Sequence, residues 1–169
     1  MARLFGVTGF SGAGKTTLLV KLLPLLTGCG LRVSTIKQAH AEFDIDKPGK
    51  DSYRHREAGA GEVMVVSQKR WALMHEYHES APDSMEQMLS HLAPADLVLI
   101  EGFRDWPHPK LEVHRPALGK PLLCHDYPGI LAVASDSAMP DLVVPWFDLN
   151  DAVTLADFII DQARSPETP

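Results

Sequence analysis

A glycine-rich loop near the start of the chain limits the possible folds more than any other stretch. Residues 9–17 read Gly-Phe-Ser-Gly-Ala-Gly-Lys-Thr-Thr and match G-x-x-x-x-G-K-[ST], the phosphate-binding P-loop or Walker A motif. Glycines allow the backbone to turn its N–H groups inward as a cradle for an anion. Because this cradle needs a buried strand before it and a helix after it, the motif predicts a strand–loop–helix unit.

The residues on either side of the loop supply that context. Residues 4–8 indicate a short buried strand, and a leucine-rich stretch over residues 18–26 indicates a helix. A glycine-rich turn that contains Lys-Thr by chance is the alternative, and it would not explain this order of elements. We expect a nucleotide to be bound through eight residues of the loop: Gly9, Ser11, Gly12, Ala13, Gly14, Lys15, Thr16 and Thr17.

Two side chains of the loop and one acid further along have chemical roles in such a site. Lys15 would reach the β- and γ-phosphates and take part in catalysis, and the Thr16 hydroxyl would ligate a magnesium ion. Within residues 96–103, a continuous apolar run at 97–100 is bounded by polar residues, which indicates a strand buried on both faces. Glu101 comes at the carboxyl end of this run, where it fits a Walker B-like acid that contacts magnesium.

A polar stretch over residues 38–52 follows a strand that we expect at 31–37. Ligands of parallel sheets bind at the carboxyl ends of the strands, so Asp44 or Asp46 could complete the magnesium shell. A solvated loop with turn-forming residues is the alternative, and the pattern does not decide between the two.

The remaining pattern is that of an α/β protein. The order strand, helix, strand over the first 37 residues predicts parallel strands, and further strands are expected at 111–115 and 129–134. Two strands at 62–67 and 70–75 predict an antiparallel hairpin. We therefore predict a three-layer P-loop NTPase fold with a mostly parallel sheet and an antiparallel β extension.

Helix starts are indicated by capping residues. Asp51 or Ser52 would cap a helix over residues 53–58, and Asp83 with Glu86 forms a capping box. Asn150 would cap the last helix.

Length and charge fit one domain of this kind. The chain has 169 residues, 45% of them hydrophobic, which matches the usual ~100–200 residues of a domain. We expect a single nucleotide-binding domain over residues 1–164, with the hairpin extension at 62–76 and a frayed tail at 165–169. A net charge of −6 provides no basic field for nucleic acid or for a membrane surface.

The sequence also indicates a compartment. No run reaches the ~18 apolar residues that a membrane-spanning helix needs, and no signal peptide precedes the glycine loop. Cys29 and Cys124 lie among apolar residues, which favours free thiols in a reducing compartment. We expect a cytoplasmic protein.

Taken together, the motifs resemble the molybdopterin-guanine dinucleotide biosynthesis adaptor family, known as MobB. The matching stretches run in order over nearly the whole chain: GFSGAGKTTL, TIK followed by FDIDKPGKDSYRHREAGA, LVLIEGFRDWPHPKLEVHR, and AVASD. The P-loop is generic, whereas the second and third stretches are much more specific. One departure is visible after TIK, where the family is richer in histidine: this chain has Gln38 and Ala41 and keeps only His40.

The resemblance implies a homodimeric GTP-binding protein with weak, magnesium-dependent GTPase activity. Such a protein assists a partner, the molybdenum cofactor guanylyltransferase, in joining GMP to molybdopterin. The antiparallel extension of the family is thought to mediate dimerisation, and the strands between Glu62 and His75 would be that extension.

Guanine recognition would require a carboxylate against the N1–H and the exocyclic amine of the base. Asp136, at the end of a late strand, is our candidate for this role, although no Asn-Lys-x-Asp element supports it. A buried carboxylate there would reject adenine, which would leave it unpaired. The alternative is that Asp136 caps the following turn.

Two other functions remain open on the same fold. The chain could be an ATP-dependent small-molecule kinase or ligase that uses residues 38–56 as acceptor site, since one P-loop scaffold hosts many reactions. It could also be a binding module without catalysis, in which nucleotide sets a conformation and Glu101 is dispensable. For the GTPase we expect slow turnover, because no residue stands out as the positioner of the attacking water.

Overall fold

The structure is a computed structural model that describes residues 2–39, 43, 45–77 and 84–164. The chain divides into two compact units, each described by itself below. The first unit comprises Met1–Gln38 with His91–Pro169, and the second comprises Ala39–Ser90.

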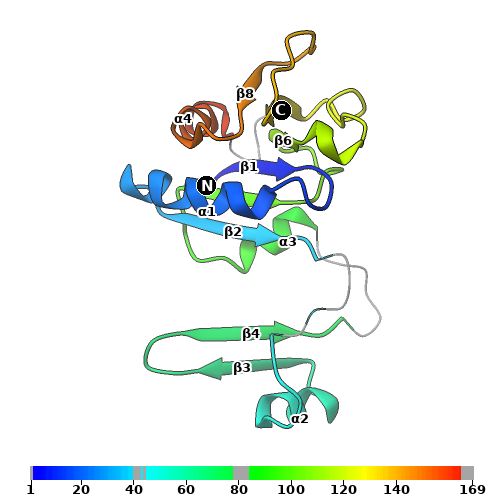
Figure 1. The fold of residues 1–169 in the computed structure, drawn as a ribbon. Coiled ribbons are helices and arrows are strands. Elements are labelled where there is room, and N and C mark those ends of the chain that lie inside the picture. The colour runs from blue at the N-terminus through cyan, green and yellow to red at the C-terminus, as the bar shows by residue number, and fades with distance from the viewer. Residues whose placement is uncertain (1, 40–42, 44, 78–83, 165–169) are drawn as a thin grey trace. The chain divides into compact units, whose positions relative to one another are not determined.

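The first unit is built on a six-stranded sheet in the order β2-β5-β1-β6-β7-β8 (Figure 1). Every pair of neighbouring strands is parallel, which confirms the predicted mostly parallel α/β architecture. The elements of this unit are β1 (Arg3–Thr8), α1 (Lys15–Gly28), β2 (Val33–Lys37), β5 (Leu97–Glu101), β6 (Lys110–His114), the 3₁₀ helix η1 (Pro116–Leu118), β7 (Ile130–Ser135), β8 (Trp146–Asp148) and α4 (Ala152–Gln162).

The main core lies on one face of this sheet. Phe5 and Val7 of β1 are fully buried, and they pack with leucines of α1 and with Leu155 and Ile159 of α4. Successive residues of a strand lie on alternate faces, so Gly6 lies on the face of the sheet opposite to Phe5 and Val7. A side chain added at Gly6 would collide with the His108 imidazole, which shows that the chain segment around His108 covers that face.

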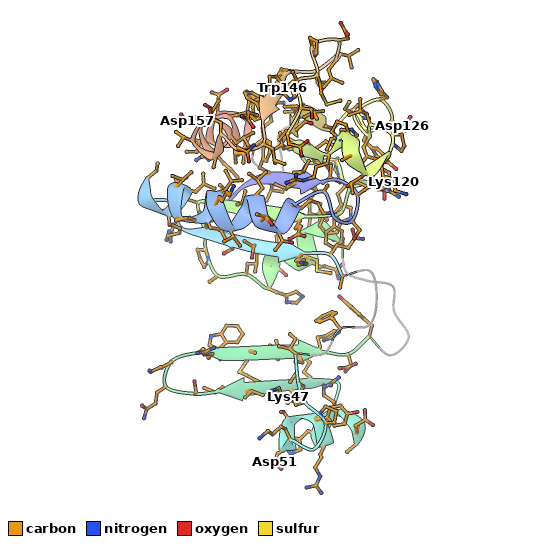
Figure 2. All side chains as sticks on the ribbon, viewed as in Figure 1. Lys47, Asp51, Lys120, Asp126, Trp146 and Asp157 are labelled. Atoms are coloured by element: carbon orange, nitrogen blue, oxygen red, sulfur yellow. The ribbon has the colours of Figure 1, made fainter. Side chains whose placement is uncertain are left out.

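The second unit contains an antiparallel hairpin of β3 (Glu62–Val66) and β4 (Trp71–His75), which confirms the predicted extension. The turn between the strands is closed by the Ser67 N–H, which donates to the Arg70 carbonyl over 2.9 Å. The unit also contains α2 (Asp51–Glu57) and α3 (Met85–Ser90). Figure 2 labels Asp51, the first residue of α2, and Lys47 just before it.

Two of the predicted helix caps are wrong. Helix α2 begins earlier than predicted, with Lys50 in the cap position and no side-chain cap, because the Ser52 hydroxyl donates to Asp46 Oδ1 over 2.8 Å instead. Helix α4 is capped by Asp151, whose carboxylate accepts the Thr154 N–H over 3.1 Å. Asn150 is occupied in the preceding turn, where its N–H and its amide both donate to Asp148.

The start of α3 has the predicted type of cap with other residues. The Ser84 hydroxyl accepts the Gln87 N–H over 3.3 Å, and the Gln87 amide oxygen accepts the Ser84 N–H over 2.9 Å, as in a capping box. Asp83, the predicted cap, lies outside the described residues. Strand β8 has only three residues, and the sequence did not predict it.

Two further expectations concern the cysteines and membrane-spanning helices. Cys29 is exposed and Cys124 is buried, and both are free thiols. None of the helices in the described ranges is long and apolar enough to cross a membrane.

Candidate nucleotide-binding site

The glycine loop connects β1 to α1 at the carboxyl edge of the sheet. Gly9, Gly12 and Gly14 have φ values of 139°, 82° and 103°, a region that side chains other than glycine rarely adopt. At Gly9 an added methyl group would also collide with the carbonyl oxygen of Val113 in β6. The loop can therefore press against the neighbouring strand only with glycine at this position.

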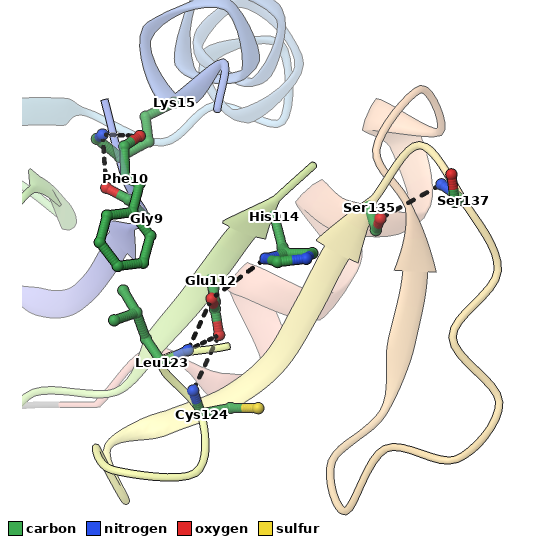
Figure 3. Close-up of polar contacts among 9 residues, drawn as sticks. All are labelled: Gly9, Phe10, Lys15, Glu112, His114, Leu123, Cys124, Ser135 and Ser137. Carbon is green, nitrogen blue, oxygen red and sulfur yellow. Dashed lines mark hydrogen bonds and ion pairs between the residues drawn. The ribbon is translucent and has the colours of Figure 1, made fainter. Parts of the chain in front are cut away.

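Lys15 lies across the loop in this structure. Its ammonium donates to the carbonyl oxygens of Gly9 and Phe10 over 2.7 and 3.0 Å (Figure 3). Burial lowers the pKa of Lys15 below its usual value; the charge of Glu101 opposes this shift, and the charge of Lys37 adds to it. A partly desolvated cation at this loop suits an anion that replaces the two carbonyl partners.

Thr16 and Glu101 are brought together by the fold. The Thr16 hydroxyl, at the start of α1, donates to Glu101 Oε1 over 3.0 Å, and Glu101 is buried at the carboxyl end of β5. Strand β5 lies directly beside β1, with Val7 opposite Glu101, so the acid is held next to the glycine loop. A hydroxyl and a carboxylate oxygen are the hard donors that magnesium prefers, so these residues fit the ion.

Lys37 and Gln38 hold the end of β5; the sequence had indicated no role for Lys37 and had marked Gln38 only as a departure from the family. Lys37, the last residue of β2, places its ammonium 3.5 Å from Glu101 Oε1 and 3.5 Å from Thr16 Oγ1. Gln38 accepts the Phe103 N–H with its side-chain oxygen over 2.8 Å, and its own N–H donates to the Glu101 carbonyl over 2.9 Å. The available signal was their place in the sequence, since Lys37 is the last residue of TIK and Gln38 follows it, but this becomes meaningful only once β2 is known to lie beside β5.

Asp46 belongs to the second unit. There its carboxylate accepts the Ser52 hydroxyl over 2.8 Å and faces Arg56 Nε at 3.6 Å, which is long for a hydrogen bond. These contacts tie Asp46 to α2, and its role as a metal ligand stays a prediction. Asp44 and His40 lie outside the described residues.

Asp136 lies near the glycine loop and already has a partner. Arg115 Nη1 donates to Asp136 Oδ2 over 2.7 Å, while Nε of the same guanidinium donates to the Ala13 carbonyl over 2.9 Å. Arg115 therefore links the loop to the end of β7. The following turn is bonded through Ser135, whose hydroxyl accepts the Ser137 N–H over 3.3 Å (Figure 3).

Strand β6, whose backbone at Val113 lies against Gly9 of the loop, has a buried polar face. Lys110, Glu112 and His114 alternate with the apolar Leu111 and Val113, and all five are buried. The Lys110 ammonium donates to the carbonyls of Trp106 and His108, and burial lowers the pKa of this lysine to about 8.

The Glu112 carboxylate anchors the chain that returns over this face. It accepts the N–H groups of Leu123 and Cys124 over 2.9 Å each, and His114 Nδ1 lies 3.8 Å from it (Figure 3). The anchored chain includes η1, and Leu118 at its end would lie 3.8 Å from a methyl group added at Gly12. Glu112 thus contributes to the site through the backbone that it holds.

Comparison with known proteins gives a consistent set of similarities. The family model of molybdopterin guanine dinucleotide synthesis protein B (MobB) matches residues 4–136. The molybdopterin-guanine dinucleotide biosynthesis adapter proteins of Haemophilus influenzae and Escherichia coli are each 42% identical to the chain. The alignments cover 92% of this chain and 86% of the first protein, and 95% of this chain and 93% of the second.

A solved structure has the same fold. The crystal structure of a molybdopterin-guanine biosynthesis protein B superposes with a TM-score of 0.74 at 26% identity, covering 94% of this chain and 98% of that one.

Proposed function

The chain belongs to the family of molybdopterin guanine dinucleotide synthesis protein B, and on this premise we propose that it is an adaptor in the biosynthesis of that dinucleotide. In finer detail, we propose a GTP-binding protein with weak, magnesium-dependent GTPase activity. It would assist a guanylyltransferase partner that joins GMP to molybdopterin.

The pairing of Thr16 with Glu101 is the observation that best supports nucleotide binding. The two residues come from distant parts of the sequence, and their oxygens lie 3.0 Å apart beside a loop whose glycines have positive φ. A hydrogen bond between a serine or threonine of a P-loop and a buried acid would be unnecessary in a simple turn. It is expected where both groups serve one magnesium ion.

Each residue of the site has a defined task in this proposal. The loop N–H groups and the start of α1 would hold the phosphates, and Lys15 would exchange the carbonyls of Gly9 and Phe10 for phosphate oxygens. Thr16 and Glu101 would hold the magnesium ion. When bound, the ion neutralises charge on the β- and γ-phosphate oxygens.

Guanine selection by Asp136 requires an exchange of partners. The carboxylate now accepts a hydrogen bond from Arg115, and the N1–H and amine of guanine would compete for it. Because Arg115 also contacts the loop carbonyl of Ala13, recognition of the base would be linked to the phosphate cradle.

The proposed function predicts a definite binding pattern. We expect the wild type to bind GTP in preference to ATP with magnesium present and to hydrolyse it slowly. Lys15→Ala should weaken GTP binding by about tenfold or more, because the charge that contacts the phosphates is removed. Asp136→Asn should keep phosphate affinity and lose the preference for GTP. Isothermal titration with GTP and ATP, followed by phosphate-release assays, measures both effects.

Other results would favour the competing functions. Equal or better binding of ATP, with phosphate transferred to an added acceptor, would support a small-molecule kinase or ligase on the same fold. Tight GTP binding without hydrolysis above background, unchanged in Glu101→Gln, would support a binding module. Binding that is unaffected by Lys15→Ala would contradict the site itself.

A further inference from the structure

Lys37 lies where a cation belongs in the proposed site. It is the last residue of β2, and the strand register places it opposite Glu101, the last residue of β5. Its ammonium is 3.5 Å from Thr16 Oγ1 and 3.5 Å from Glu101 Oε1, and these two oxygens are 3.0 Å apart. The ammonium is therefore equally close to both oxygens that would ligate magnesium.

We propose that Lys37 is a built-in counter-cation that holds the metal ligands in the nucleotide-free protein and keeps divalent cations out until nucleotide arrives. This inference rests on the proposed function, because it takes Thr16 and Glu101 as the ligands of the ion.

The burial of Glu101 explains why such a cation is present. A carboxylate that is removed from water is costly unless a positive group or hydrogen-bond donors compensate its charge. Thr16 supplies one donor, while Lys15 directs its ammonium to the carbonyls of Gly9 and Phe10. Within the described part of the chain, Lys37 is the cation within ion-pair distance of Glu101.

The exposure of Lys37 explains why the cation can be displaced. Its side chain remains 60% exposed, against 11% for that of Glu101, so the ammonium keeps much of its hydration. The lysine of this pair loses little by returning to water, whereas the buried Glu101 would be left uncompensated unless another cation replaces Lys37. Lys37 can therefore leave Glu101 without disturbing the strands that carry the two residues.

A bound nucleotide would change which cation, the Lys37 ammonium or magnesium, is favoured beside Glu101. Magnesium alone would have to displace the ammonium of Lys37, whose ion pair within the described ranges is with Glu101. The phosphates of a bound nucleotide offer Lys37 a new partner and offer the ion further oxygen ligands. Magnesium and the nucleotide would thus each raise the affinity of the protein for the other, because coupling between two ligands is reciprocal.

Manganese binding to the nucleotide-free protein tests this role without any activity measurement. We expect Lys37→Met to bind Mn²⁺ about tenfold more tightly than the wild type, as removal of a unit charge at this distance implies. Lys37→Arg should behave as the wild type because it keeps the charge. Lys21→Met removes one charge from an exposed part of α1 and should have no effect. Water-proton relaxation titrations with Mn²⁺ give the affinities.

A double variant assigns the site of the gain. Adding Glu101→Gln to Lys37→Met should abolish the extra Mn²⁺ binding. If the gain persists, or if Lys37→Met binds Mn²⁺ no better than the wild type, the role of Lys37 is wrong.

Nucleotide titrations separate this inference from the proposed function. If GTP binds in a Lys15-dependent manner but Mn²⁺ binding ignores Lys37, only the counter-cation role fails. If Lys37→Met gains Mn²⁺ binding through Glu101 while no variant binds GTP, the proposed function fails, and the role of Lys37 in excluding cations stands.

Discussion

Single residues of the glycine loop tolerate little change, and Gly9 shows why. Its φ of 139° is unfavourable for any side chain, and a methyl group there would meet the carbonyl oxygen of Val113. The backbone of β6 cannot move away easily, because Glu112 on the same strand is bonded to two N–H groups on its buried face. Both the conformation and the available space therefore demand glycine.

A pair of alanine substitutions separates these two demands. Gly9→Ala should lower the free energy of unfolding by at least about 2 kcal/mol, since strain and overpacking add. Gly30→Ala, at a φ of 83° in open space, should cost only the conformational penalty of about 1 kcal/mol. Urea denaturation of the three proteins measures both values. Equal losses would show that the contact with Val113 is unimportant.

The structure gives Gln38 a role that the sequence did not indicate. The resemblance drew attention to it as a position where the family is richer in histidine. In the structure its side-chain oxygen accepts the Phe103 N–H, and Phe103 has a positive φ of 45° in the turn after Glu101. Gln38 therefore stabilises an unusual backbone turn directly after the acid of the site.

At the scale of elements, edge strand β2 carries Lys37 and must be held in register. Its other end is fixed by Asp96, whose carboxylate accepts hydrogen bonds from the Arg32 N–H over 2.8 Å and from the Arg32 guanidinium. These bonds to Arg32 hold the pKa of Asp96 down at about 2. The ionised carboxylate thus links the starts of β2 and β5.

The depressed pKa predicts a pH-dependent contribution to stability. The contribution of Asp96 is fully present above about pH 4, the pKa of an unfolded aspartate, and is lost as the pH falls through about 2. We expect Asp96→Asn to be less stable than the wild type at pH 7, with the difference vanishing between pH 4 and 2. Urea denaturation over this range measures it. A difference that is constant with pH would contradict the ionic link.

Strand β6 is buried on both faces, of which one is apolar and the other polar. Leu111 and Val113 join the apolar core, whereas Lys110, Glu112 and His114 form the opposite, polar face. Alternation is the ordinary signal of a strand with one solvated face, but here both faces are buried. Lys110 and Glu112 bond to backbone groups of the segments before and after the strand, which residue pattern alone does not reveal.

At the scale of the whole molecule, the hairpin in the second unit has an exposed apolar surface. Met64, Val66 and Trp71 are 57%, 67% and 61% exposed, and Leu73 is 39% exposed. A two-stranded hairpin is marginal by itself, and contiguous apolar surface marks an interaction site. We propose that a second copy of the chain covers this surface, as the resemblance implies for the extension.

Charge placed on the hairpin should break such a dimer. We expect the wild type to sediment as a dimer and Trp71→Glu to sediment as a monomer, because a carboxylate would be buried in an apolar interface. Val20→Glu is the matched control, since Val20 is 64% exposed on α1. Sedimentation velocity distinguishes the species. A monomeric wild type, or a dimeric Trp71→Glu, would contradict this interface.

Local sequence patterns were sufficient to predict much of the fold of this protein. The loop between β1 and α1, the buried strand that ends at Glu101 and the hairpin follow from glycine spacing, apolar runs and turn residues. Helix starts were less reliable, because Asp, Ser and Asn compete for several local bonds. Ser52 bonds to Asp46, and Asn150 bonds to Asp148, so neither caps the helix that follows it.

The sequence by itself determined most of the elements, with β8 as an exception, and which residues are candidates for binding phosphate, because both depend on neighbours along the chain. Only the tertiary structure decided that β5 lies between β1 and β2. This order brings Glu101 to Thr16 and places Lys37 beside both. On the other side of β1, the placement of β6 between β1 and β7 brings Arg115 between the loop and Asp136. Strand order is set by how the apolar faces pack together, and that choice is made between residues far apart in the sequence.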